Sequence, residues 1–377
     1  MSYRLAPGWR IAGLAAILSL LGAGAAGLAL AEAPAGSSVI KRPSLGSSPV
    51  RPARWRQSAR SDIGLRLLRE AAVACQGTSY GGEQVVLWRV VQGRSSSSVL
   101  RVWHQPGQVT LVQEASGAPG DAAAAARPAA ADDQDLDGPL GLSDRLLVLL
   151  QTNYDVVYAG RGSADDRGAL VVEVRRPGGG LAARFWLDAV TKLPLRREIF
   201  ATNARMISED AFINLKLGVR GLGGMPAPAA APWTAQLDQA RLAGLRARGW
   251  PLPGQLPGNL ALFAATEMSG RSSPVIDLSY SDGLAVVSLF VQRGELARPM
   301  PGWRLVAMPG RTVYSMDPDD RSFAWSGKGF VYTVVADPPI ATASQVAAAL
   351  PATDPPGFWV RIGRGFRRFA AWLNPLR

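Results

Sequence analysis

The chain has 377 residues, 47% of them hydrophobic, so it is long enough for two ordinary domains and apolar enough to form their cores. Its net charge of +12 comes mainly from arginines, which are spread along the sequence. They do not form the single basic segment that is typical of nucleic-acid binding. One cysteine, Cys75, excludes an intrachain disulfide, and one histidine, His104, leaves zinc without a recognised set of ligands. We therefore expect neither a metal nor a cofactor.

Residues 1–31 have the features of an export signal. Arg4 and Arg10 precede an uncharged run at residues 11–30, and a small-residue triplet predicts cleavage after Ala31. The run is also about as long as a bilayer-spanning helix, so an uncleaved N-terminal anchor is the alternative. Either interpretation places the rest of the chain outside the cytoplasm.

A spacer and a helix precede the first strands. Residues 32–60 are rich in Pro, Ser, Ala and Arg, which is typical of a disordered spacer. A helix is predicted from Ser61 or Asp62 to Ala74. Its apolar face comprises Leu67, Leu68, Ala71, Ala72 and Cys75. Cys75 is therefore predicted to be a core residue, with a reactive thiol as the alternative.

Three strand-like runs follow, at residues 84–91, 99–104 and 109–113. Trp88 and Trp103 lie in these runs and are predicted to be core or cavity-lining residues. His104 ends the second run just before a Gln-Pro-Gly turn. A catalytic role would require a nucleophile and further partners that the sequence does not offer, so we predict a structural role for His104.

An acidic insertion divides the first domain. Residues 115–138 form a low-complexity loop in which four aspartates are grouped: Asp132, Asp133, Asp135 and Asp137. A calcium loop would need further ligands and a terminal Glu, so a solvated insertion is the better interpretation. A short helix at residues 143–151, capped by Ser143, and strands at 155–160 and 170–176 follow.

The clearest strand pattern begins at residue 182. Ala183, Phe185 and Leu187 alternate with residues of the opposite face. A turn at residues 191–194 leads to a second alternating run at 195–200, in which Leu195, Arg197 and Ile199 share a face, and a third run is predicted at 211–217. This pattern predicts an antiparallel meander, and residues 61–218 as a whole predict an α+β domain.

The second domain is separated from the first by a Gly/Pro/Ala-rich linker and a short helix, together residues 219–250. Residues 251–352 are predicted to form this domain. Its clearest feature is a hairpin of residues 275–280 and 284–291 around the turn pair Asp282-Gly283. Further strands at residues 305–308, 312–316, 322–325 and 330–336, and a closing helix at 342–350, complete it.

Residues 353–377 form a basic, amphipathic tail. Drawn as a helix, its apolar face comprises Trp359, Ile362, Phe366, Phe369 and Leu373. Its opposite face carries Arg361, Arg364, Arg367 and Arg368. This pattern is typical of a helix that lies on an anionic membrane surface, and packing against the second domain is the alternative.

The sequence resembles the RseB/MucB family of envelope-stress regulators from about Leu65 to Leu350. The residues that carry the resemblance occur in the family's order: residues 67–71, Tyr80-x-Gly82, residues 102–104, residues 153–156, residues 184–188 with 195–198, and residues 280–291. Each of these motifs is moderately specific, and their order across two domains behind an export signal is more specific than any one of them.

The resemblance implies an exported, non-enzymatic protein. Its first domain would be a lipoprotein-carrier-like half-barrel, a curved antiparallel sheet wrapped over helices, with candidate lining residues Trp88, Trp103, Phe185, Leu187 and Ile199. Its smaller α/β second domain would bind the outer segment of a membrane anti-sigma factor and shield that segment from proteolysis. Lipids or misplaced envelope components in the half-barrel would weaken the complex. The alternative function is a lipid or lipoprotein carrier, and an enzyme is the third option.

Overall fold

The computed structural model describes residues 54–89, 95–107, 111–114, 125–126, 142–219, 235–268, 273–296, 303–308, 311–315, 322–337 and 340–351. These residues divide into two compact units. The first holds the described residues up to Val219 and also Asp282–Leu284, and the second holds the others from Ala235 on. The predicted signal or anchor, the basic tail and nearly all of the acidic insertion lie outside the described residues. Among the helices described, none combines the length and the apolar character that crossing a membrane requires.

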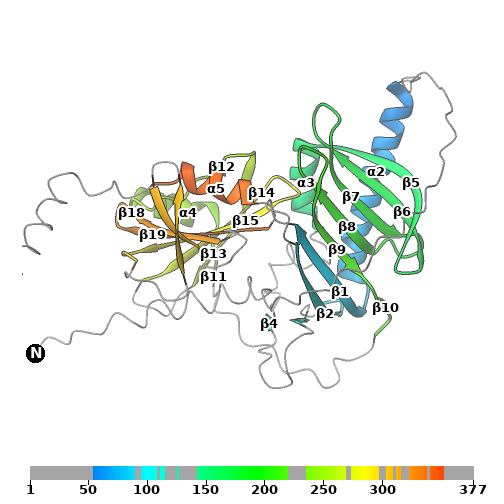
Figure 1. Cartoon of the computed structure of the whole chain (residues 1–377), viewed down its shortest axis with the longest axis horizontal. Coiled ribbons are helices and arrows are strands. Elements are labelled where there is room, and N and C mark those ends of the chain that lie inside the picture. Colours follow the sequence, from blue (N-terminus) through cyan, green and yellow to red (C-terminus); the bar gives the residue numbers. More distant parts are fainter. Residues whose placement is uncertain are drawn as a thin grey trace, which may run out of the picture. The chain divides into compact units, whose positions relative to one another are not determined.

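The first unit is a curved antiparallel sheet with two helices against it (Figure 1). Its elements are α2 (Arg54–Gly77), β1 (Tyr80–Arg89), β2 (Ser95–His104), β3 (Leu111–Glu114), β4 (Ala125–Ala126), α3 (Asp144–Asn153), β5 (Asp155–Ala164), β6 (Arg167–Arg175), β7 (Leu181–Asp188), β8 (Pro194–Phe200), β9 (Met206–Phe212) and β10 (Lys216–Leu217). The strand order is β4-β3-β2-β1-β9-β8-β7-β6-β5, and β10 pairs with β1. This arrangement confirms the predicted α+β half-barrel.

Both predicted helices of the first unit are present. The predicted face of α2 is buried throughout, from Leu67 to Cys75, and its leucines pack with inward-facing residues of β6 and β7 such as Val172. The helix begins at Arg54, earlier than predicted, because no proline or glycine interrupts the chain between Arg54 and Ser61. In α3, Ser143 is the N-cap as predicted, and its hydroxyl accepts a hydrogen bond from the Leu146 amide.

The predicted meander is formed by β7, β8 and β9, but its third strand lies earlier than the sequence indicated. We expected residues 211–217, and β9 is Met206–Phe212. Its central residues, Glu209 and Asp210, interrupt the apolar pattern that a strand prediction relies on. Their carboxylates pair with arginines of the neighbouring β8, so the charges are tolerated inside the sheet.

The second unit is a separate antiparallel sheet with its own core. Its elements are β11 (Ala235–Gln236), α4 (Gln239–Ala247), β12 (Gln255–Leu256), β13 (Leu260–Met268), β14 (Val275–Ser281), β15 (Val286–Arg293), β16 (Arg304–Met308), β17 (Arg311–Ser315), β18 (Ser322–Gly327), β19 (Phe330–Asp337) and α5 (Ile340–Ala349). The strand order is β11-β13-β14-β15-β19-β18-β17-β16, and β12 pairs with β13.

The predicted hairpin of the second domain is confirmed as β14 and β15, and Gly283 in its turn has a φ of 100°. Strand β13 was not predicted. A register shift between Leu262 and Ala264 breaks its alternation, so a period of two does not show in the sequence. Leu242 of α4 and Val346 of α5 are buried in the same core as Leu289 of β15.

Candidate functional site

The inner face of the first sheet, defined as the face against α2 and α3, is the candidate functional site. Phe185, Leu187 and Ile199 lie there, buried in one cluster with leucines of α2 and α3. Strand register places Trp88 on the same face, opposite Ser208, and its side chain is only partly buried. Trp103 pairs with Gly81 and therefore lies on the outer face. Trp103 therefore does not line the inner face, whereas a ligand-lining role for the other four residues stays a prediction.

A buried ion pair lies on the inner face, and the sequence analysis did not single it out. The Arg197 guanidinium contacts the Asp210 carboxylate oxygen Oδ2 through Nε at 2.9 Å and Nη2 at 2.7 Å. The two side chains are 11% and 7% exposed. The signal in the sequence was Arg197 itself, a charged residue between Leu195 and Ile199 on an apolar face, which requires a buried counter-charge.

Ser208 adds a second polar group to the inner face. It faces Trp88 on one side and Ile199 on the other. Its hydroxyl is buried and has no hydrogen-bond partner among the described residues. Together with the Arg197–Asp210 pair, this hydroxyl makes the inner face partly polar near β1, β8 and β9, whereas the part nearest α2 is apolar.

The outer face of the same sheet carries a ladder of ion pairs. Glu173 binds Arg184 at 2.8 Å, and Arg196 binds Glu198 at 2.6 Å and Glu209 at 2.9 Å. Burial raises the pKa of Glu173, but its hydrogen bonds from Arg175 and Arg184 outweigh that effect, so the pKa lies below its ordinary value. Because these arginines and glutamates neutralise one another, the ladder offers little net charge to a partner.

Trp186 lies between two of the ladder's arginines. The guanidinium carbons of Arg184 and Arg196 are 5.6 Å and 4.9 Å from the centre of the ring. Cation–π contacts at these distances hold a partly buried aromatic ring in place. The ion pairs and the cation–π contacts at the centre of the outer face therefore stabilise the curved sheet.

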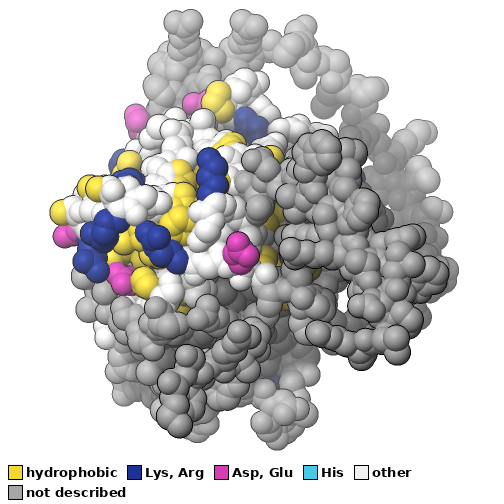
Figure 2. Space-filling model, turned by 90° about the vertical axis from the view of Figure 1, so that its left-hand side faces the viewer, with side chains coloured by type: hydrophobic (Ala, Val, Ile, Leu, Met, Phe, Trp, Pro, Cys, Tyr) yellow, Lys and Arg dark blue, Asp and Glu magenta, His cyan; other side chains and the backbone are white. Residues whose placement is uncertain are grey.

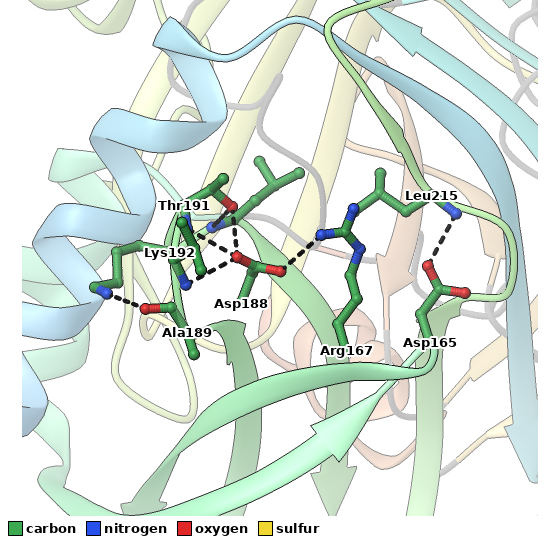
Figure 3. Close-up of polar contacts among 9 residues, drawn as sticks. Asp165, Arg167, Asp188, Ala189, Thr191, Lys192 and Leu215 are labelled. Carbon is green, nitrogen blue, oxygen red and sulfur yellow. Dashed lines mark hydrogen bonds and ion pairs between the residues drawn. The ribbon is translucent and has the colours of Figure 1, made fainter.

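The turn between β7 and β8 is closed by Asp188 (Figure 3). One carboxylate oxygen of Asp188 accepts hydrogen bonds from the amides of Val190 and Thr191 and from the Thr191 hydroxyl. The other oxygen is 3.1 Å from the Arg167 guanidinium. Burial alone would raise the pKa of Asp188. The hydrogen bonds and the positive charge of Arg167 outweigh that effect, so the pKa lies below its ordinary value. These contacts hold the turn between β7 and β8 in place, and they give both carboxylate oxygens of Asp188 a partner within the protein.

His104 and Cys75 are both buried near the C-terminal end of α2. The His104 ring stacks on Tyr80 at 5.0 Å between centroids, and its Nε2 atom is 3.3 Å from the Gln76 carbonyl oxygen. Burial lowers the pKa of His104 and raises the pKa of the Cys75 thiol. Both residues therefore favour their neutral forms. In the described part of the chain, no three His, Cys, Asp or Glu side chains are grouped so as to hold a metal ion.

The end strands of the two sheets are a second kind of candidate site, because an unpaired edge can bind an extended peptide. The sheet of the first unit ends at β4 and at β5, and α2 packs closely over β5. The sheet of the second unit ends at β11 and at β16, and the Leu305 side chain of β16 is 63% exposed. On the described surface, hydrophobic side chains lie next to those of Lys and Arg (Figure 2).

Comparison with known proteins gives matches among solved structures. No protein-family model and no curated protein sequence matches the chain. The crystal structure of MucB has a TM-score of 0.50 and 22% identity, covering 76% of this chain and 97% of that one. MucB in complex with MucA(peri) has a TM-score of 0.45 and 22% identity, and the MucA/MucB complex of Pseudomonas aeruginosa has 0.46 and 21%. Each complex match covers 77% of this chain and 99% of the other.

The chain therefore shares the fold of MucB across both of its units. The expected resemblance in fold is confirmed, and the predicted boundaries of the two modules stay a prediction. At this level of identity the similarity establishes the fold and leaves the binding partner to be inferred.

Proposed function

We propose that this protein is an exported, non-enzymatic regulator that binds the outer segment of a membrane anti-sigma factor and protects that segment from proteolysis. The observation that carries the proposal is the fold shared with MucB over 76% of this chain, together with family-like residues in both units. A solved structure holds MucB together with MucA(peri). The half-barrel would sense a lipid or another envelope-stress ligand, and its occupation would weaken the complex.

Ligand sensing follows from linkage between two sites. A ligand that binds the partner-free form more tightly must lower partner affinity by the same factor by which the partner lowers ligand affinity. The partly polar inner face, with Trp88 only partly buried and the Ser208 hydroxyl without a partner among the described residues, favours an amphiphilic ligand over a purely apolar one. The same feature supports the second candidate function, a lipid or lipoprotein carrier.

Affinity capture from solubilised membranes distinguishes the two functions. The tagged protein should recover a single-span anti-sigma factor, identified by mass spectrometry, and deletion of residues 353–377 should leave this capture intact. The purified outer segment of that factor should then resist protease longer when this protein is added. Recovery of lipids with no such membrane protein would support the carrier and refute the regulator.

The C-terminal tail is proposed to attach the protein to the membrane surface. Its four arginines, Arg361, Arg364, Arg367 and Arg368, would each contribute about 1 kcal/mol of attraction to anionic headgroups before salt screening. Sedimentation with vesicles that contain anionic lipid should therefore depend on the tail and fall with salt. Equal binding by the tail-deleted protein would refute this role.

A further inference from the structure

The hairpin of β5 and β6 extends past the part of the first sheet that holds it. The last residue of β6 to pair with β7 is Ala169, which also pairs with Gly162 of β5. The helix α2 contacts β5 earlier in the strand, where a side chain at Gly64 would lie 3.0 Å from the backbone nitrogen of Tyr158. Residues 162–168 therefore lie beyond this contact with α2 and at the end of the ladder with β7, and we call them the flap.

The flap is attached to the rest of the first unit at two places (Figure 3). A carboxylate oxygen of Asp165 accepts a hydrogen bond of 2.9 Å from the amide of Leu215, which lies between β9 and β10. Arg167 and Gly168 bind the turn between β7 and β8, and the Arg167 guanidinium is 3.1 Å from the Asp188 carboxylate. The bond from Leu215 to Asp165 therefore connects the flap to a segment that is distant from it in the order of the strands.

The flap packs against an apolar cluster at the end of the inner face. Ala169, at the base of the flap, is buried in one cluster with Leu195, Phe212 and Leu215, and Ala164 of the flap packs partly buried against this cluster. Leu195 and Phe212 each stand two residues from a member of the buried ion pair, so both side chains lie on the inner face. The flap is thus at one end of the candidate site.

Several features make the flap easier to displace than the rest of the sheet. Gly162 and Gly168 stand at its two ends, where glycine tolerates the dihedral changes of a hinge, and both are exposed. Asp165 and Asp166 form its turn with φ values of 51° and 55°, a left-handed conformation that costs free energy for residues other than glycine. A part of the structure with exposed backbone and little buried apolar surface opens at lower free energy than the core.

Resting on the proposed sensing of an amphiphile by the half-barrel, we propose that the flap is the gate of the inner face and that the Asp165–Leu215 hydrogen bond is its latch. When this bond breaks, the flap turns outward about Gly162 and Gly168. The cluster around Leu195 is then open to an acyl chain, which follows it to the inner face. In the closed form the flap separates the same cluster from water, so opening of the latch limits the rate at which the ligand enters and leaves.

Substitution of the latch tests the gate, with a fatty acid that carries a solvent-sensitive fluorophore as the probe. Asp165→Ala removes the acceptor of the Leu215 amide, so stopped-flow fluorescence should show that the probe enters and leaves about fivefold faster or more. Asp166→Ala is the matched control, because Asp166 is exposed and has a similar φ in the same turn, and its rates should equal those of the unmodified protein. Asp165→Asn keeps a carbonyl oxygen as acceptor and should give intermediate rates.

Hydrogen exchange measures the latch without any ligand. In Asp165→Ala the amides of Leu215 and of the flap should exchange faster, while those of β7 and β8 stay as in the unmodified protein. If exchange becomes faster throughout the first unit, Asp165→Asn replaces this variant in both measurements.

Unchanged exchange at Leu215, or faster exchange with unchanged rates for the probe, would overturn the gate and leave the proposed function intact. If the unmodified protein does not bind the probe, ligand sensing and the gate are both wrong, whereas capture of the membrane partner still tests the rest of the proposed function.

Discussion

Removing one member of the Arg197–Asp210 pair should strongly destabilise the first unit. Asp210→Leu leaves the Arg197 guanidinium in the interior with its main counter-charge deleted, and Arg197→Met leaves the Asp210 carboxylate in the same position. The two side chains are 11% and 7% exposed, so water cannot fully replace the lost partner. Breaking a buried pair in this way costs about 3–5 kcal/mol.

The double variant Arg197→Met/Asp210→Leu should recover much of that loss. It removes both charges together and puts apolar side chains of similar size beside Phe185 and Val86, their cross-strand neighbours. Replacement of a buried ion pair by apolar residues is often neutral or stabilising. The double variant should therefore be more stable than either single variant.

Urea unfolding, followed by circular dichroism of the full chain, measures these differences. With a slope of about 1–3 kcal/mol per molar urea, each single variant should lower the midpoint by roughly 1 M or more. The exposed pair Arg66–Glu70 on α2, with side chains 66% and 42% exposed, is the control, and its removal should cost about 0.5 kcal/mol or less. Single-variant costs as small as the control, or a double variant less stable than both singles, would refute the reasoning.

Three further predictions concern the turn, the histidine and the helix contact. Asp188→Asn should cost about 1–3 kcal/mol at neutral pH. Because the folded pKa of Asp188 is depressed, its contribution is present above about pH 4 and lost as the pH falls, so the variant and the unmodified protein should converge in acid unfolding curves. Burial lowers the pKa of His104 in the folded protein, so the free energy of unfolding should decrease as the pH drops below about 6.5. His104→Gln should flatten that pH dependence. Cells that carry this variant should have the same phenotype as cells with the unmodified protein, and a changed phenotype with a folded variant would favour an enzyme. Gly64→Leu should cost about 1–3 kcal/mol through its clash with β5, whereas Gly77→Leu, with open space around it, should cost far less in the same urea assay.

Local patterns in the sequence predicted most elements of the first unit. The alternation in β7 and β8 correctly assigned Phe185 and Leu187 to one face and Trp186 to the other, because each strand repeats every two residues whatever it pairs with. The helical face of α2 and the Ser143 cap were predicted for the same reason, since both depend on residues within a few positions of one another.

Long-range pairing explains what the sequence did not reveal. Strand β1 pairs with β9, far along the chain, and that pairing brings Ser208 opposite Trp88. Strand β9 was misplaced because Glu209 and Asp210 resemble loop residues until their arginine partners are known. Strand β13 was missed because its register shift breaks the alternation.

The sequence by itself therefore determined the α+β class and the faces of individual strands and helices, because these depend on local spacing and on composition. Only the tertiary structure decided which charges are paired and which end strand α2 covers. Those properties depend on segments brought together by folding, such as Arg197 with Asp210 and Gly64 with Tyr158, and no short stretch of sequence encodes that proximity.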